Sequence, residues 1–377
     1  MNYSTDGFNP SDNNQYRYSP PFTGPCRPHF VAPEWWNREK SIIKSLSAIA
    51  SVSVLFYILF SGLFVGLFQG LFLILKSIPS FDYNAFSAKW NSPDFQYVFD
   101  IVYSLITIGI PFGIAGRFAR KKGLLPDIPM DKPIKHKSLP LLVAGAFGAC
   151  MFGNIVTSYI DSLVRMLTGF EIKMPDIPTP TKSVGGILIF YLAISVVPAL
   201  VEEMAFRGII MQSLRRYGDM FAIVSSAVIF GLMHCNLQQI PFAIMAGIVI
   251  GFAVIETESV WTGVIIHFLN NAFSASVTLV SEFYGMDSPQ IMAVNVVFYA
   301  SIAIGVLCAV MYLRMYRPVL KTSPLVNCGR NFYGNVPMYS EKVSTARLFK
   351  TFFLTAPMII AFIAVVYQTI VLIINME

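Results

Sequence analysis

The chain has 377 residues, of which 55% are hydrophobic and only 13% are charged. Soluble domains carry about 25% charged residues, so this composition excludes an ordinary water-soluble enzyme and indicates that lipid is the main solvent. The net charge of +6 does not indicate a nucleic-acid-binding protein, because the basic residues fall between hydrophobic segments, where they act as topology signals.

The hydrophobic segments predict a series of membrane-spanning helices after a polar start. Residues 1–40 are rich in polar residues and scattered prolines, so we expect a disordered tail there and a membrane domain over 41–377. A helix needs about 20 apolar residues to cross the hydrocarbon core. The candidate spans are 45–75, 97–116, 139–160, 185–201 continuing to about 214, 219–235, 238–255, 259–281, 290–313 and 349–374. The sequence therefore predicts an all-α polytopic transmembrane bundle of eight or nine spans.

Lysine and arginine are distributed unevenly between the connections. With nine spans and a cytoplasmic N-terminus, most of the 27 basic residues lie on the cytoplasmic side, as the positive-inside rule requires. We therefore expect an integral membrane protein with its N-terminus in the cytoplasm and its C-terminus on the opposite side. The basic loops and short connections are typical of a bacterial plasma-membrane protein.

Glycines recur at four-residue spacing in two of the spans. Gly62, Gly66 and Gly70 lie in the first span, and Gly247 and Gly251 lie in a later one. Small residues on one helix face allow close helix packing within a membrane. We expect both sets to serve internal packing, and a homo-oligomer through Gly62, Gly66 and Gly70 is the second interpretation.

Ionisable and amide side chains inside apolar segments are the strongest functional signal. A charge at the bilayer centre costs roughly 2.5–3.5 kcal/mol on insertion scales, so such residues usually have partners or a function. Three clusters from three segments stand out, and they comprise Glu202, Glu203 and Arg207, then His234, then His267, Asn270 and Asn271.

The first cluster predicts one paired and one unpaired carboxylate. Glu203 and Arg207 are four residues apart and share a helix face, with the glutamate on the favourable N-terminal side. Glu202 points about 100° away from that face and is not neutralised by the pair. A free carboxylate in a membrane interior is suited to take and return a proton during catalysis.

The histidine clusters leave two chemistries open. Glu202, His234 and His267 could bind Zn²⁺ and leave a coordination position for water. Alternatively Glu202 could activate water directly, while His267 and Asn271, four residues apart, donate hydrogen bonds to a developing oxyanion. Either histidine alone would more often be a buried hydrogen-bonding residue, but packing alone does not explain three clusters on three helices.

These clusters resemble the motifs of the CPBP family of intramembrane proteases, which includes the CAAX prenyl protease 2 type of enzyme. The family pattern is Glu-Glu-x-x-x-Arg, then Phe-x-x-x-His, then His-x-x-x-Asn or Asp. Here it reads Glu202-Glu203-Met-Ala-Phe-Arg207, Phe230-Gly-Leu-Met-His234 and His267-Phe-Leu-Asn-Asn271. The resemblance covers residues 185–275, which would form the catalytic core.

The resemblance implies a role for each motif residue. Glu202 would be the general base that activates water, and Glu203 and Arg207 would shape the site. His234 would position the water or bind a metal. His267 and Asn271 would stabilise the oxyanion, or His267 would be a metal ligand. The chain lacks His-Glu-x-x-His, the zinc arrangement on one helix, so the sequence does not decide between a glutamate-type and a metallo-type endopeptidase.

Three hypotheses follow for the function. The first is an endopeptidase that cleaves a membrane-associated peptide or protein, with membrane lipid as its surroundings and no nucleic acid among its partners. The second is a non-catalytic scaffold or bacteriocin-immunity protein on the same fold. The third is a transporter with Glu202, His234 and His267 as a proton relay, which is disfavoured because no internal repeat is evident.

Overall fold

The computed structural model describes residues 33–134, 137–169, 177–316, 318, 320 and 344–376, and within these residues the secondary structure is helical with no strand. The predicted polytopic all-α bundle is therefore confirmed. Eight helical segments are long and apolar enough to cross a membrane. A ninth apolar helix, α9, has only 15 residues. The chain is accordingly an integral membrane protein.

The first half of the bundle is built from long helices, two of which contain π-helical segments. These elements are α1 (Pro33–Ser77), α2 (Tyr83–Trp90), α3 (Pro93–Ser104), η1 (Leu105–Gly109), α4 (Ile110–Lys121), α5 (Leu139–Thr168), α6 (Val184–Tyr191), η2 (Leu192–Val196), α7 (Val197–Glu203), η3 (Met204–Met211), α8 (Gln212–Leu214) and η4 (Arg215–Tyr217). The π-helical segments are η1, η2 and η3, while η4 is a 3₁₀ turn. Elements α6 to η4 together form one continuous span, Val184–Tyr217.

The second half contains five longer helices and one short amphipathic helix, α13, which precedes the last of them. These elements are α9 (Asp219–Met233), α10 (Gln239–Thr257), α11 (Val260–Tyr284), α12 (Pro289–Met315), α13 (Thr345–Phe353) and α14 (Ala356–Met376).

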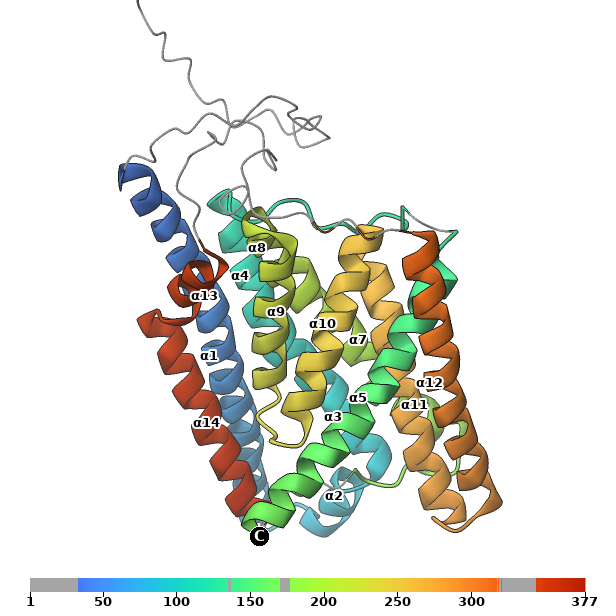
Figure 1. Cartoon of the computed structure of the whole chain (residues 1–377). Helices are drawn as coiled ribbons and strands as arrows, with labels where there is room; N and C mark the ends of the chain where they lie inside the picture. The colour runs from blue at the N-terminus through green and yellow to red at the C-terminus, as the bar shows by residue number, and fades with distance from the viewer. Residues whose placement is uncertain are drawn as a thin grey trace, which may run out of the picture.

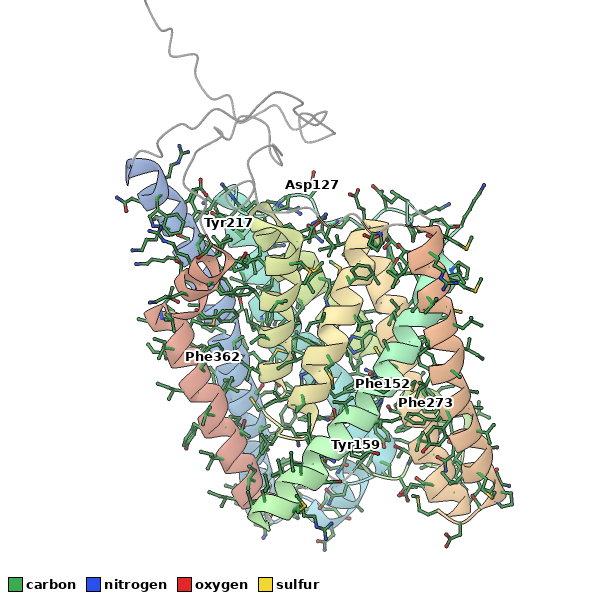
Figure 2. The ribbon with its side chains drawn as sticks, viewed as in Figure 1. Asp127, Phe152, Tyr159, Tyr217, Phe273 and Phe362 are labelled. Atoms are coloured by element: carbon green, nitrogen blue, oxygen red, sulfur yellow. The ribbon has the colours of Figure 1, made fainter. Side chains whose placement is uncertain are left out.

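Successive spans run in alternating directions, so the start of α1 and the C-terminus lie at opposite ends of the bundle (Figure 1). The start of α1 shares its side of the bundle with the C-terminal end of α4, with η4 and with α13 (Figure 1). Tyr217 and Asp127 mark this end, while Phe152, Tyr159 and Phe273 lie further along the bundle (Figure 2). The connection between α9 and α10 stops short of the far end, so it lies within the depth of the bundle (Figure 1).

Small residues allow a close helix crossing between α5 and α12. A Cβ atom on Gly148 would lie 2.6 Å from Cα of Gly305, and one on Gly145 would lie 3.2 Å from the backbone of Ala309. Only glycine permits this approach, which gives the two backbones extensive van der Waals contact where no hydrophobic driving force exists between helices.

The two repeated-glycine patterns have different outcomes. A Cβ on Gly247 would lie 2.9 Å from Ala227 Cβ, and one on Gly251 would lie 3.3 Å from Met211 Sδ. Internal packing is therefore confirmed for these two. The same expectation is wrong for Gly62, Gly66 and Gly70, because a Cβ there would meet nothing within 4 Å. These three glycines lie on a face of α1 that no described part of the chain covers, and their role in an oligomer stays a proposal.

Two other boundaries differ from the prediction. Helix α1 begins at Pro33, so residues 33–40 are helical and not part of a tail, while the tail over 1–32 lies outside the described residues. The expected single span 349–374 is interrupted between α13 and α14. Pro357 explains the break, because proline lacks an N–H and disfavours helical geometry in the residue before it.

Candidate active site

The glutamate motif sits on a helix whose regular bonding is interrupted on both sides. Helix α7 carries Glu202 and Glu203 and lies between the π-helical segments η2 and η3. Pro198 is at the start of α7 and has no N–H to donate to the carbonyl of Ile194, four residues earlier. The side chain of Asn271 donates to that carbonyl instead, at 3.3 Å from Nδ2 to O. A carbonyl that the proline leaves unpaired in one helix thus accepts a hydrogen bond from a motif residue of another helix, α11. π-Helical turns often mark functional sites.

Glu203 is the centre of a fully buried ionic network. Its Oε1 atom accepts a hydrogen bond from Arg207 Nη1 at 2.6 Å and another from His267 Nδ1 at 2.8 Å. Glu203 is 0% exposed and Arg207 is 1% exposed. Two charge-assisted bonds to one oxygen offset the cost of burying this carboxylate. The predicted Glu203–Arg207 pair is present, and it also includes His267.

The hydrogen bond to Glu203 fixes the orientation of the His267 ring. Because a carboxylate only accepts, Nδ1 carries the proton, and Nε2 points to the other carboxylate of the motif. Nε2 lies 3.9 Å from Glu202 Oε2, too far for a direct hydrogen bond. The imidazole therefore stands between two carboxylates, bonded to Glu203 and facing Glu202. No ion pair of Glu202 is closer than this contact within the described residues.

Phe230 connects the remaining motif side chains. Its ring packs edge-on against His234 and His267, with centroids 4.9 and 5.9 Å apart, and the guanidinium of Arg207 lies 4.5 Å from its centre. Phe230 O accepts from His234 Nδ1 at 2.9 Å, which leaves Nε2 of His234 as an acceptor. The motif phenylalanine is thus in contact with both histidines and with the arginine.

The third motif supplies amide groups beside His267. Asn271 uses one of its two amide hydrogens on Ile194 O, and its own oxygen accepts from Asn270 Nδ2 at 3.1 Å. Its second amide hydrogen has no partner among the described residues. Asn270 is 5% exposed, and its Oδ1 atom has no partner among the described residues. The two side-chain amides thus form a short hydrogen-bonded chain that starts at the carbonyl of Ile194 in η2.

Gly263 is a site residue that lies outside the three motifs. It lies four residues before His267 on α11, and a Cβ there would be 2.7 Å from Glu203 Oε2 and 2.7 Å from Val254 Cγ2. Glu203 Oε2 is buried without a hydrogen-bond partner in the described structure. Gly263 lies one helical turn before His267, and this spacing was the sequence signal that could have identified it.

The zinc alternative does not fit the side chains as they are placed. Among the described residues, no three His, Cys, Asp or Glu side chains lie close enough together to hold a metal ion. Glu202, His234 and His267 therefore do not form a ready set of ligands. Because Nδ1 of His267 and of His234 is engaged in a hydrogen bond, only Nε2 of each ring is open to a metal. A bound metal stays a prediction of the sequence.

Comparison with known proteins agrees with the motifs. Residues 184–273 match the family model described as Type II CAAX prenyl endopeptidase Rce1-like. The resemblance expected from the motifs is thus confirmed for this part of the chain. One relative, named "Putative membrane peptidase YdiL", from Bacillus subtilis (strain 168), is 31% identical over 80 residues. That match covers 21% of this chain and 33% of the relative, well under two thirds of its length. No solved structure matches the chain significantly.

Proposed function

We propose that this protein is an intramembrane endopeptidase that hydrolyses a peptide bond of a membrane-associated peptide or protein with water activated by Glu202. The observation that carries the proposal is the position of His267 between the two glutamates, 2.8 Å from Glu203 and 3.9 Å from Glu202. A purely structural cluster would need only the Glu203–Arg207 pair. The matching family and the named membrane peptidase support the same activity.

Glu202 is the general base in this proposal. Its carboxylate takes a proton from water, the hydroxide oxygen bonds to the carbonyl carbon of the substrate, and the carbonyl oxygen becomes an oxyanion. When the C–N bond breaks, the proton held by Glu202 passes to the departing amine. Atoms and charge balance without a further reactant. His234 would orient the water through its free Nε2, which can accept a hydrogen bond from it.

The oxyanion needs donors that are fixed before the reaction. Asn271 has a second amide hydrogen beyond the one that Ile194 O accepts. His267 can donate through Nε2 when its ring carries both protons. His267 is held by a buried hydrogen bond and Asn271 by a part-buried one, so these donors would not need to reorganise as charge develops. Glu203 and Arg207 act through His267 and are positioning residues.

Protein termini in membranes of the native host test the proposal. Cells would carry the wild-type chain, Glu202→Gln, or the control Asp127→Asn, which changes an exposed carboxylate at the end of the bundle (Figure 2). We expect new termini with wild type and with the control, and their loss with Glu202→Gln. Mass spectrometry of membrane fractions measures them and identifies the substrate.

Equal abundance and equal thermal stability of the three chains are required for the comparison. The same termini in all three, with a biological effect retained by Glu202→Gln, would refute the peptidase and favour a scaffold. The Glu202→Gln variant also tests the proposed base separately from the residues that position the site. Glu202 lies outside the buried network of Glu203, Arg207 and His267, so an amide at this position should not unfold the protein.

A further inference from the structure

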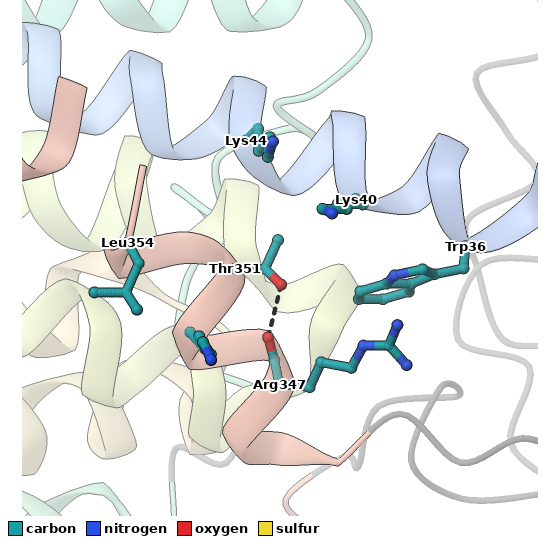
Figure 3. Close-up of a pocket in the computed structure, with 7 residues that line it drawn as sticks. Trp36, Lys40, Lys44, Arg347, Thr351 and Leu354 are labelled. Atoms are coloured by element: carbon teal, nitrogen blue, oxygen red, sulfur yellow. Dashed lines mark hydrogen bonds between the residues drawn. The ribbon is translucent and has the colours of Figure 1, made fainter. Parts of the chain in front are cut away.

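A strongly basic pocket lies at the end of the bundle where α1 begins. It has a volume of about 450 Å³ and opens between α1 and α13. Its lining residues are Trp36, Lys40, Lys44, Arg347, Lys350, Thr351 and Leu354. Figure 3 shows Trp36, Lys40 and Lys44 along one side and Arg347, Thr351 and Leu354 along the other. Four of the seven side chains are cations, and none is acidic.

Buried contacts hold the two helices that form the pocket. Ser47, one turn beyond Lys44, donates to the carbonyl of Phe352 at 2.6 Å and lies 2.7 Å from the hydroxyl of Thr355. Leu348 and Phe352 are almost fully buried on the inner face of α13. The amphipathic pattern of α13 therefore places its apolar residues in the bundle and its basic residues in the pocket.

The positive charge in the pocket is not neutralised by the described protein. Lys40, Lys44, Arg347 and Lys350 make no ion pair with a carboxylate of the described residues, and all four are exposed. The nearest acid in sequence, Glu39, faces the other way and accepts from Tyr217 at 2.8 Å. Like charges held together by packed helices repel one another, and an anion in the pocket would relieve that repulsion.

The apolar part of the pocket indicates what kind of anion fits. The guanidinium of Arg347 lies 4.3 Å from the centre of the Trp36 ring, and tryptophan and arginine are typical of the membrane–water interface. Leu354, at the end of the pocket toward α14, is 61% exposed. Beyond it, Ile359, Ile360 and Ile363 of α14 are exposed as well. The cations thus lie at the end of the bundle next to exposed apolar side chains of α14.

We propose that this pocket binds the phosphate of an anionic phospholipid headgroup, with the acyl chains along α14. Basic pockets between membrane helices near the headgroup level bind phosphate-bearing lipids. A free phosphate ion shares the headgroup chemistry, but it would not use the apolar surface next to Leu354. The proposal does not depend on the peptidase activity, because the pocket residues belong to α1, to α13 and to the residue that follows α13, and none is a motif residue.

Lipid binding to the purified full-length protein tests the site. The variant replaces all four cations, as Lys40→Gln, Lys44→Gln, Arg347→Gln and Lys350→Gln. The control removes four exposed cations at the same end of the bundle, as Arg117→Gln, Arg120→Gln, Lys121→Gln and Lys122→Gln. Native mass spectrometry with added phosphatidylglycerol, cardiolipin or phosphatidylcholine gives the apparent affinities. We expect anionic lipid to bind the pocket variant at least about tenfold more weakly than wild type, and the control within about twofold.

The other outcomes overturn the proposal. Equal weakening in the control would show that only the general positive charge of this end matters. Equal binding of phosphatidylcholine would show that the anionic headgroup is not recognised. Displacement of the lipid by millimolar inorganic phosphate, with no effect of acyl chains on affinity, would assign the pocket to a free anion. Two half variants, one on each helix, keep the test valid if the fourfold variant unfolds, because each should weaken binding on its own.

Discussion

Glu203 Oε1 is the atom at which the candidate site is assembled. Arg207 reaches it along one helix and His267 reaches it from another, at 2.6 and 2.8 Å. The i to i+4 spacing predicts the first contact from the sequence, but no spacing predicts the second, since residues 203 and 267 meet only when α7 and α11 pack. The orientation of His267 toward Glu202 follows from that second contact.

Replacement of Arg207 by alanine should destabilise the protein as well as inactivate it. The change leaves the buried Glu203 carboxylate with only one donor, and breaking a buried pair from one side costs about 3–5 kcal/mol. Thermal unfolding of the purified protein in detergent measures the loss, with Arg117→Ala, an exposed arginine, as the control. Normal stability of Arg207→Ala would show that the pair does not stabilise the fold.

Gly263→Ala should disturb the site more than its size suggests. The added methyl group would lie 2.7 Å from Glu203 Oε2 and from Val254 Cγ2, so the carboxylate must move and with it the ring of His267. We expect a stability loss of about 1–3 kcal/mol and a marked loss of cleavage. Gly66→Ala is the matched control, because a Cβ there meets nothing within 4 Å. An active and stable Gly263→Ala protein would contradict the role of Gly263.

At the scale of the elements, interruptions of regular helix decide where the site residues stand. The π-helical segments on both sides of α7 and the short helices α9 and α10 all lie around the motifs. The sequence indicates one of these interruptions, which Pro198 marks. It does not indicate η3, which contains Arg207 and has no proline. Local sequence therefore explains only those helix interruptions at which a proline has no N–H to donate.

Gly148→Ala tests whether helix contact in this bundle depends on small residues. A Cβ at this position would lie 2.6 Å from Cα of Gly305 and 2.7 Å from the carbonyl of Ser301, so α5 and α12 must separate. We expect a lower unfolding temperature in detergent for Gly148→Ala, and no decrease for Gly113→Ala, where nothing lies within 4 Å. Equal stability of the two variants would mean that the helices can shift apart without loss.

At the scale of the whole molecule, the basic residues gather at one end. Together, the start of α1, the end of α4, η4 and α13 carry most of the described arginines and lysines outside the site, and these four elements share that end of the bundle. The other end carries few, among them Lys76 and Lys89. This asymmetry supports the orientation expected from the sequence, with the N-terminus in the cytoplasm.

Reporter fusions measure that orientation directly. A reporter that is active only in the cytoplasm should function at the N-terminus and fail at the C-terminus, because nine helical segments run in alternating directions within the described residues. A reporter that is active only outside should give the reverse result. Activity of one reporter at both ends would show that an even number of segments crosses, so that an odd number of the nine, such as the 15-residue α9 alone, does not cross.

The sequence by itself determined the helical membrane fold, most span positions and the three motif clusters. It could do so because lipid requires long apolar helices and makes each buried charge costly, and both requirements are visible along the chain. The tertiary structure alone decided that Glu203 joins His267, that Gly263 leaves space for the carboxylate, and that Gly62, Gly66 and Gly70 face outward. These three features depend on which faces of distant helices meet in the folded bundle. Helix periodicity shows which residues share a face, but it does not show which helix packs against that face.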